Sequence, residues 1–100
     1  MSLFITFEGG DGSGKSTQIG LLTNRLKTSD IPHLVVQEPG STDLGLCVRE
    51  WLKRGTPSNQ AISRETELFL FAAARVELVT NIIKPALARH NTIVIADRYA

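Results

Sequence analysis

Cysteine is almost absent from this sequence. Cys47 is the only one in 100 residues, so the chain cannot form an internal disulfide bond. Neither Cys47 nor the two histidines, His33 and His90, fall into a spacing typical of a zinc site. This composition favours a reducing compartment, and we therefore predict a cytoplasmic protein.

An excess of charge of one sign is also lacking. The chain has 11 Lys and Arg residues against 10 Asp and Glu residues, which gives a net charge of +1. The basic residues are scattered along the chain, whereas nucleic acids and anionic membrane surfaces attract proteins through concentrated positive charge. We therefore expect no nucleic-acid partner and no membrane partner.

Long hydrophobic runs and leader sequences are missing too. The longest apolar tract, Leu68–Val79, contains Arg75 and Glu77 and is shorter than the roughly 18 residues that a membrane-spanning helix needs. Met1 and Ser2 lead directly into apolar residues, without the basic segment and cleavage site of a signal peptide. The sequence predicts neither a transmembrane segment nor a signal peptide.

Apolar residues nevertheless make up 42% of the chain. Three short runs rich in β-branched or aromatic residues, at 3–7, 33–37 and 92–96, predict strands, and we expect the first to be buried on both faces. Apolar residues recur at helical spacing between these runs. The alternation of strands and helices predicts an α/β fold with a parallel sheet.

Three helices are expected between the strands. The first repeats Ile19, Leu22 and Leu26 and ends near residue 28. The second ends near Gly55, and its expected buried face consists of Leu44, Val48, Trp51 and Leu52. The third starts after Ser63, a suitable N-cap, and should break or kink at Pro85.

The domain organisation is simple. The sequence contains no internal repeat, low-complexity tract or interdomain linker. Three strands make a narrow parallel sheet, because such sheets are usually wider and covered on both faces. We therefore expect residues 1–100 to be the N-terminal part of a single larger domain.

Residues 9–16 carry the clearest chemical motif. Their sequence, Gly-Gly-Asp-Gly-Ser-Gly-Lys-Ser, fits the phosphate-binding pattern G-x-x-x-x-G-K-[ST] between a strand and a helix. Backbone N–H groups of such a loop surround a polyphosphate, and the helix N-terminus adds partial positive charge. Lys15 should contact the β- and γ-phosphates, Ser16 should bind Mg²⁺, and Thr17 should bind a phosphate oxygen. The predicted nucleotide-binding residues are Gly9, Gly10, Asp11, Gly12, Ser13, Gly14, Lys15, Ser16 and Thr17.

Charged residues also follow each predicted strand. Glu8 and Asp11 flank the start of the phosphate loop, Glu38 follows the second strand, and Asp97 and Arg98 end the third. Ligands of parallel α/β sheets bind at this carboxyl edge. Acids there can hold water around Mg²⁺ or accept a sugar hydroxyl, and an arginine can clamp a phosphate.

Together these motifs resemble the thymidylate kinase family, whose members phosphorylate dTMP with ATP in dTTP synthesis. The resemblance covers essentially the whole chain, and the order and spacing of its motifs are more specific than the phosphate loop alone. The matching stretches are residues 4–9 with the loop, Glu38-Pro-Gly-Ser-Thr42, Leu70-Phe-Ala-Ala-Ala-Arg75, Pro85-Ala-Leu87 and Asp97-Arg-Tyr99.

The resemblance implies a P-loop, nucleoside-monophosphate-kinase-like three-layer α/β fold. It places a dTMP-site helix at about residues 64–84 and the Asp-Arg-Tyr motif at 97–99. Lys15, Asp97 and Arg98 would be the catalytic residues, and Ser16 and Asp97 would lie at the metal, Mg²⁺.

The resemblance also assigns the acceptor site. Asp11 would position the 3′-hydroxyl of dTMP. Phe71 would stack on thymine and Arg75 would hydrogen-bond it. Arg98 would hold the dTMP phosphate. The remaining dTMP-binding residues implied are Glu38, from the loop after the second strand, and Arg49, facing the monophosphate pocket.

The chain departs from the family pattern at several positions. Gln37 stands where bacterial members often have Arg, Ser41 replaces a glycine, and Glu77 replaces a residue that is often Gln. Gly12 stands where some members carry an arginine, which resembles the type that supplies its transition-state arginine from a C-terminal lid. We therefore expect the isolated 100-residue chain to be inactive.

ATP and dTMP are thus the expected ligands, with Mg²⁺ as cofactor and a homodimer as the complete protein. Two alternatives remain open. A deoxynucleoside kinase would use an acid after the second strand as a base, and Glu38 fits that position. A noncatalytic nucleotide-binding module is the other alternative, if the protein ends at residue 100.

Overall fold

The computed structural model describes residues 1–10 and 12–98, so the roles expected of Asp11 and Tyr99 lie outside the described residues. The elements follow in the order β1 (Leu3–Glu8), α1 (Lys15–Thr28), β2 (His33–Glu38), α2 (Asp43–Arg54), α3 (Arg64–Leu78), η1 (Val79–Ile83), α4 (Lys84–Ala88) and β3 (Ile93–Arg98). Among these residues no helix is long and apolar enough to cross a membrane.

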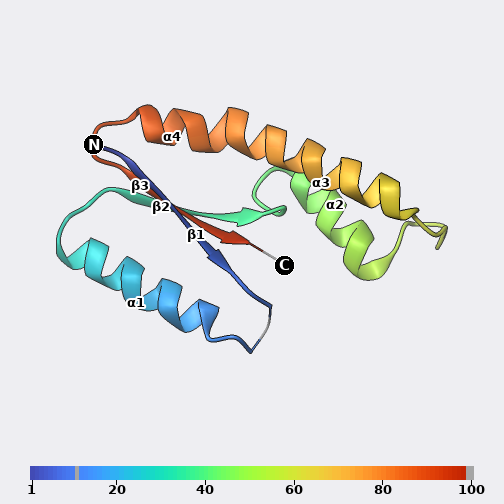
Figure 1. Ribbon diagram of the computed structural model, residues 1–100, viewed down its shortest axis with the longest axis horizontal. Helices are drawn as coiled ribbons and strands as arrows, with labels where there is room; N and C mark the ends of the chain where they lie inside the picture. Colours follow the sequence, from blue (N-terminus) through green and yellow to red (C-terminus); the bar gives the residue numbers. More distant parts are fainter. Residues whose placement is uncertain (11, 99–100) are drawn as a thin grey trace.

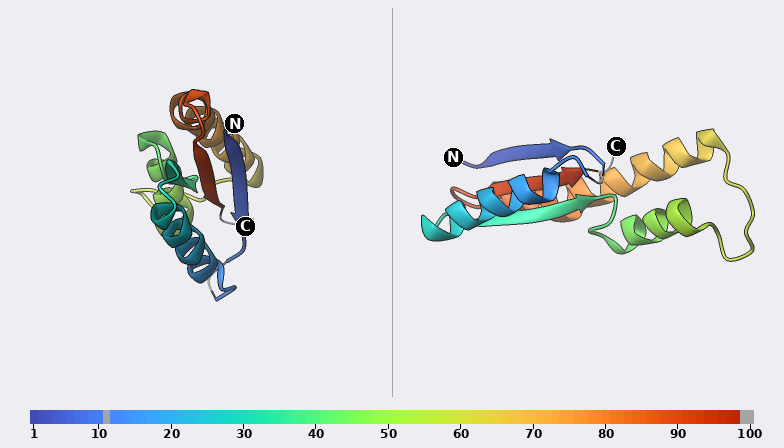
Figure 2. Two further views of the ribbon diagram at one scale, coloured as in Figure 1. Left: turned by 90° about the vertical axis from the view of Figure 1, so that its left-hand side faces the viewer. Right: turned by 90° about the horizontal axis from the view of Figure 1, so that it is seen from below.

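The three strands described form one parallel sheet in the order β1-β3-β2 (Figure 1). Helix α1 lies on one face of the sheet, and the continuous helical segment from α3 through η1 to α4 lies on the other (Figures 1 and 2). This arrangement confirms the predicted α/β fold with a parallel sheet.

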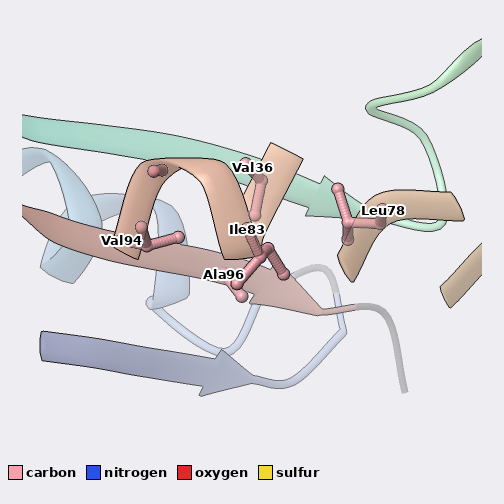
Figure 3. Packing of buried hydrophobic residues seen from close by; sticks show 6 residues of the cluster. Val36, Leu78, Ile83, Val94 and Ala96 are labelled. Carbon is pink, nitrogen blue, oxygen red and sulfur yellow. The ribbon is translucent and has the colours of Figure 1, made fainter. Parts of the chain in front are cut away.

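The central strand β3 faces both helical layers. Ile95 packs with Ile19 and Leu26 of α1, whereas Val94 and Ala96 belong to a second cluster with Leu78, Ile83 and Val36 (Figure 3). Because side chains alternate along a strand, the odd residues of β3 point to α1 and the even residues to α3 and its continuation. The same alternation applies to the last two residues of β3, Asp97 and Arg98.

The expectation that β1 is buried on both faces is wrong. None of its six residues is fully buried, and Leu3 and Phe4 are exposed. The reason is that β1 is an edge strand of the sheet, whereas the two helical layers centre on β3. Its apolar run therefore predicts the strand correctly but not its burial.

The predicted buried face of α2 is partly wrong. Val48 is buried, but Leu44 and Trp51 are exposed. The predicted end of α2 is confirmed, since Gly55 caps the helix and its N–H donates to the Trp51 carbonyl.

The helical interruption lies one turn earlier than predicted. The π-helical segment η1 spans Val79–Ile83, and α4 then continues past Pro85 to Ala88. Proline lacks an N–H and its ring collides with the carbonyl four residues earlier, here Asn81. The wider π turn at that carbonyl accommodates the proline without ending the helix.

The chain is extended along one axis, with dimensions of 48 × 30 × 19 Å and a radius of gyration of 15.1 Å. A compact domain of this length has a radius of gyration of about 13 Å. Helix α2 and the start of α3 extend beyond the carboxyl ends of the strands (Figures 1 and 2). Residues of α3 form one wall of the candidate site.

Candidate functional site

Three charged side chains stand in a row at the carboxyl edge of the sheet. The register pairs Glu8 of β1 with Arg98 of β3, and Arg98 with Glu38 of β2. An Nη1 of Arg98 lies 3.0 Å from Oε1 of Glu8, and its Nε lies 2.6 Å from Oε2 of Glu38. Three strands thus contribute to one ionic row on the α3 face of the sheet.

The opposite face carries the phosphate-loop lysine. Nζ of Lys15 lies 2.6 Å from Oδ1 of Asp97 and donates to the Arg98 carbonyl at 3.0 Å. Lys15 and Asp97 are largely buried, with 10% and 22% of their side chains exposed. Because Asp97 and Arg98 are adjacent on β3, their side chains leave opposite faces of the strand. The predicted catalytic residues Lys15, Asp97 and Arg98 are therefore brought together around one strand end.

The phosphate loop leads into an uncapped helix. Gly14 is the N-cap of α1 with φ 82°, a left-handed conformation that favours glycine, and it makes no side-chain cap. The first turn of α1 contains no acid, and Ser16 and Thr17 are exposed there. Gly9, Gly10, Gly12 and Ser13 form the remainder of the described loop, with Ser13 N–H donating to the Gly10 carbonyl. Among the described residues no side chain caps this helix terminus, and a helix N-terminus of this kind suits an anion.

A cleft of about 720 Å³ opens on the α3 side of the sheet. Its walls are mainly apolar, and charged groups gather at one end. Phe71, which is 43% exposed, projects from α3 into the lining. The lining residues are Glu38, Pro39, Leu68, Phe71, Ala72, Arg75, Val76, Val79, Thr80 and Arg98. An apolar cleft that ends in arginines suits a ligand with a flat apolar part and an anionic part.

Glu38 connects two arginines at the charged end of this cleft. Arg75 donates from Nε to Oε1 of Glu38 at 2.9 Å and from Nη2 to Oε2 at 3.2 Å. Arg98 reaches Oε2 as well, so both carboxylate oxygens of Glu38 are engaged by guanidinium groups. A carboxylate held in this way is poorly placed to take a proton from a hydroxyl, which disfavours Glu38 as the base of a deoxynucleoside kinase.

Arg49 lies outside the cleft lining. Its Nη1 donates to Oε1 of Gln37 at 3.3 Å. Ser41 closes the turn after β2, since its Oγ accepts from the Gln37 N–H at 2.6 Å and its N–H donates to the Gln37 carbonyl. The departures from the family pattern at Gln37 and Ser41 are therefore joined in one local network beside Arg49.

The metal donors expected from the sequence are few. Among the described residues no group of three or more His, Cys, Asp or Glu side chains is placed to hold a metal ion. Ser16 and Asp97 supply one hydroxyl and one carboxylate. This set suits Mg²⁺, which commonly takes one or two protein oxygens and completes its coordination with water and substrate phosphates.

Some residues of the site carried no expectation. The sequence places Glu8 at the strand edge but no motif indicates its contact with Arg98, and no motif indicates that Leu68, Val76 and Val79 line a cleft. Helical spacing could have indicated the last three, because residues 68, 71, 72, 75, 76 and 79 follow the i, i+3 and i+4 pattern of one helix face.

The sequence matches one protein family over nearly its whole length. The family model for thymidylate kinase matches residues 7–100. The chain is 52% identical over 99 residues to the thymidylate kinase of Thermomicrobium roseum and 49% identical over 98 residues to that of Fervidobacterium nodosum. These alignments cover 99% and 98% of the chain but 45% and 47% of the relatives, so the chain spans about half their length.

Solved structures give the same result. A thymidylate kinase from Ehrlichia chaffeensis aligns with a TM-score of 0.81 and 42% identity, covering 97% of this chain and 54% of that one. A thymidylate kinase from Candida albicans aligns with a TM-score of 0.64 and 30% identity, covering 98% of this chain and 39% of that one.

Proposed function

The chain belongs to the thymidylate kinase family, and on that premise we propose that the complete protein transfers the γ-phosphoryl group of ATP to dTMP, giving dTDP and ADP. The observation that carries this proposal is the end of β3. Asp97 pairs with the phosphate-loop lysine on one face, and Arg98 borders the cleft on the other. A donor and an acceptor phosphate would thus approach the same strand end from its two sides.

The donor side would bind ATP through the loop and the first turn of α1. Phosphate oxygens would accept from the backbone N–H groups at that helix end and from Thr17. They would also compete with Asp97 for the Lys15 ammonium, which supplies a point charge at the transferring group. Ser16 and Asp97 would hold Mg²⁺, which supplies further neutralisation of phosphate charge.

The acceptor side would bind dTMP in the cleft. Phe71 offers an aromatic face for thymine, Arg75 lies one helical turn further along α3, and Arg98 lies at the charged end. A nucleotide seated with its base at Phe71 and its phosphate at Arg98 would present that phosphate towards β3. Catalysis would consist largely of holding two anions in line and neutralising their charge.

A coupled assay of the full-length protein tests the proposal. ATP and Mg²⁺ should support dTDP formation from dTMP at roughly 1–100 per second, as is typical of kinases. Thymidine supplied in place of dTMP should give no comparable turnover. Preference for thymidine would favour a deoxynucleoside kinase, and absence of any ATP-dependent product would favour a noncatalytic module.

Acceptor recognition can be tested separately through Phe71 and Arg75. Phe71→Ala removes the stacking surface and Arg75→Ala removes a hydrogen-bond donor, so each should weaken dTMP binding about tenfold while ATP binding changes little. Calorimetry with each nucleotide measures the difference. Equal losses for both nucleotides would instead assign these residues to the common scaffold.

We further propose that the complete protein is a cytoplasmic homodimer. Cys47 is a free, exposed thiol, which suits a reducing compartment. Several large apolar side chains on α2 and α3 are exposed, including Leu46 and Phe69, and they offer surface for a subunit contact. Sedimentation equilibrium of the full-length protein should give twice the mass of one chain.

A further inference from the structure

We propose that Glu38 is a positioning residue of the acceptor site: it holds Arg75 and Arg98 in the orientations that receive the acceptor nucleotide and does not itself contact that nucleotide. This inference rests on the proposed function. It differs from the role that the family resemblance implies, in which Glu38 binds dTMP directly.

The atoms that Glu38 engages carry the inference. Both arginines give Glu38 their Nε, the nitrogen closest to the side-chain stem. A guanidinium is planar, so fixing Nε together with one further N–H fixes the direction of the whole group. Arg75 is fixed through Nε and Nη2, both on Glu38, and Arg98 through Nε on Glu38 and Nη1 on Glu8.

One terminal nitrogen of each arginine stays available. Within residues 1–10 and 12–98, Nη1 of Arg75 and Nη2 of Arg98 make no hydrogen bond to the protein. Both arginines line the cleft. Glu38 therefore occupies the inner edges of the two guanidinium groups and leaves outer N–H groups for a ligand in the same cleft.

Burial and charge indicate that Glu38 orients the arginines and not the reverse. Glu38 is only 14% exposed, whereas Arg98 is 26% and Arg75 is 53% exposed. Its neighbours Pro39 and Gly40 are buried, so the carboxylate stands on a packed segment. Without that negative charge the two cations would repel each other, and the more exposed Arg75 would turn towards water. The buried carboxylate is thus the fixed partner and the arginines are the oriented ones.

Glu38→Gln in the full-length protein is the direct test. The variant keeps the shape of the side chain, loses its charge and cannot accept from both arginines at two carboxylate oxygens. We expect the KM for dTMP to rise about tenfold while the KM for ATP stays within about twofold. A merely destabilised protein would lose active fraction, which lowers kcat and leaves both KM values unchanged.

Glu50→Gln is the matched control. It makes the same chemical change at an exposed i, i+4 pair with Arg54 on α2, so its KM values should equal those of the unmodified protein. If Glu38→Gln does not fold, Glu38→Asp retains the charge on a shorter arm that cannot span both arginines. The same selective rise in the KM for dTMP is then expected.

A double-mutant cycle with Arg75→Ala separates positioning from direct contact. If Glu38 acts through the arginines, Glu38→Gln should weaken dTMP binding much less in the Arg75→Ala protein than in the unmodified one. An undiminished penalty in that background would mean that Glu38 does not act through Arg75, and the inference, which requires that it does, would be wrong.

The two proposals fail in different ways. Normal dTDP formation together with an unchanged KM for dTMP in Glu38→Gln overturns the positioning role alone. Absence of dTDP formation by the unmodified protein overturns the proposed function and this inference with it.

Discussion

The N-terminus of α1 differs from those of α2 and α3. Thr42 caps α2 by accepting from the Gly45 N–H at 2.9 Å, and Ser63 caps α3 by accepting from the Thr66 N–H at 3.1 Å. Both of these helices carry acids in their first turn. In the part of the chain that the structure describes, α1 has no side-chain cap, its first turn contains no acid, and Lys15 adds positive charge there.

This difference distinguishes the capped ends of α2 and α3 from the proposed phosphate-binding end of α1. Caps and acids compensate the unpaired N–H groups and the positive end of the helix dipole, and they stabilise the folded chain. At the start of α1 no described side chain caps these N–H groups, and the added cation, Lys15, is balanced by Asp97 until a phosphate competes for it. Within the described residues, the start of α1 therefore lacks the stabilising cap and acid at the place where the proposed ATP phosphates bind.

The largest effect expected from this comparison follows Lys15→Met. Removing the cation at the open helix end should lower the turnover of the full-length protein by at least about 10²-fold, because the charge of the transferring group loses a fixed partner. Steady-state kinetics measure the loss, and circular dichroism should show the same helix content. Near-normal turnover would remove Lys15 from the catalytic residues.

Gly45 and Gly10 allow a second comparison, between the packed start of α2 and the loop before α1. A Cβ at Gly45 would lie 1.5 Å from the Pro39 carbonyl oxygen, whereas a Cβ at Gly10 would meet nothing within 4 Å. Gly45→Ala should therefore lower the free energy of unfolding by about 1–3 kcal/mol, since α2 or the loop must move. Denaturant titration measures this change.

Gly10→Ala is the matched substitution at the open end. It should change the free energy of unfolding by less than about 0.5 kcal/mol and still weaken ATP binding, because the methyl group would occupy space that phosphates approach. A stability loss equal to that of Gly45→Ala, with ATP binding unchanged, would show that the loop glycine serves packing.

Removing the helix caps is expected to have the next largest effect on stability. Thr42→Ala and Ser63→Ala should each lower the free energy of unfolding by about 1 kcal/mol, because one N–H at each helix start loses its acceptor. Affinity for ATP, measured by calorimetry, should not change. A loss of ATP affinity in Ser63→Ala would contradict the division between structural and functional ends, since that cap belongs to α3.

Local features of this chain could be predicted from the sequence. The strands and the Ser63 cap each depend on a few neighbouring residues, and the structure confirms them. The alternation along β3 would also have placed Asp97 and Arg98 on opposite faces. These features follow from backbone geometry that acts within one element.

Long-range features could not be predicted in the same way. The exposure of β1 depends on its place at the sheet edge, which no residue of β1 encodes. The contact of Glu38 with Arg75 joins residues 37 positions apart, and it exists because β2 and α3 meet at the cleft. The family resemblance implies a role in dTMP binding for both residues, but nothing in the sequence indicates their contact with each other.

The smallest effect, and the most specific, is expected from Gln18→Glu. Gln18 is an exposed residue in the first turn of α1, and its N–H donates to the Gly14 carbonyl. A negative charge there should raise the free energy of unfolding by about 0.3–1 kcal/mol, as the acids of α2 and α3 do for their helices. The same charge should repel phosphates and weaken ATP binding about two- to fivefold.

Gln60→Glu adds an equal charge in the loop before α3 and should leave ATP affinity unchanged. If Gln18→Glu stabilises the protein without weakening ATP binding, the open end of α1 is not where the phosphates bind. If both effects appear and fade together in high salt, a single electrostatic cause links the low stability of this helix end to its proposed ligand.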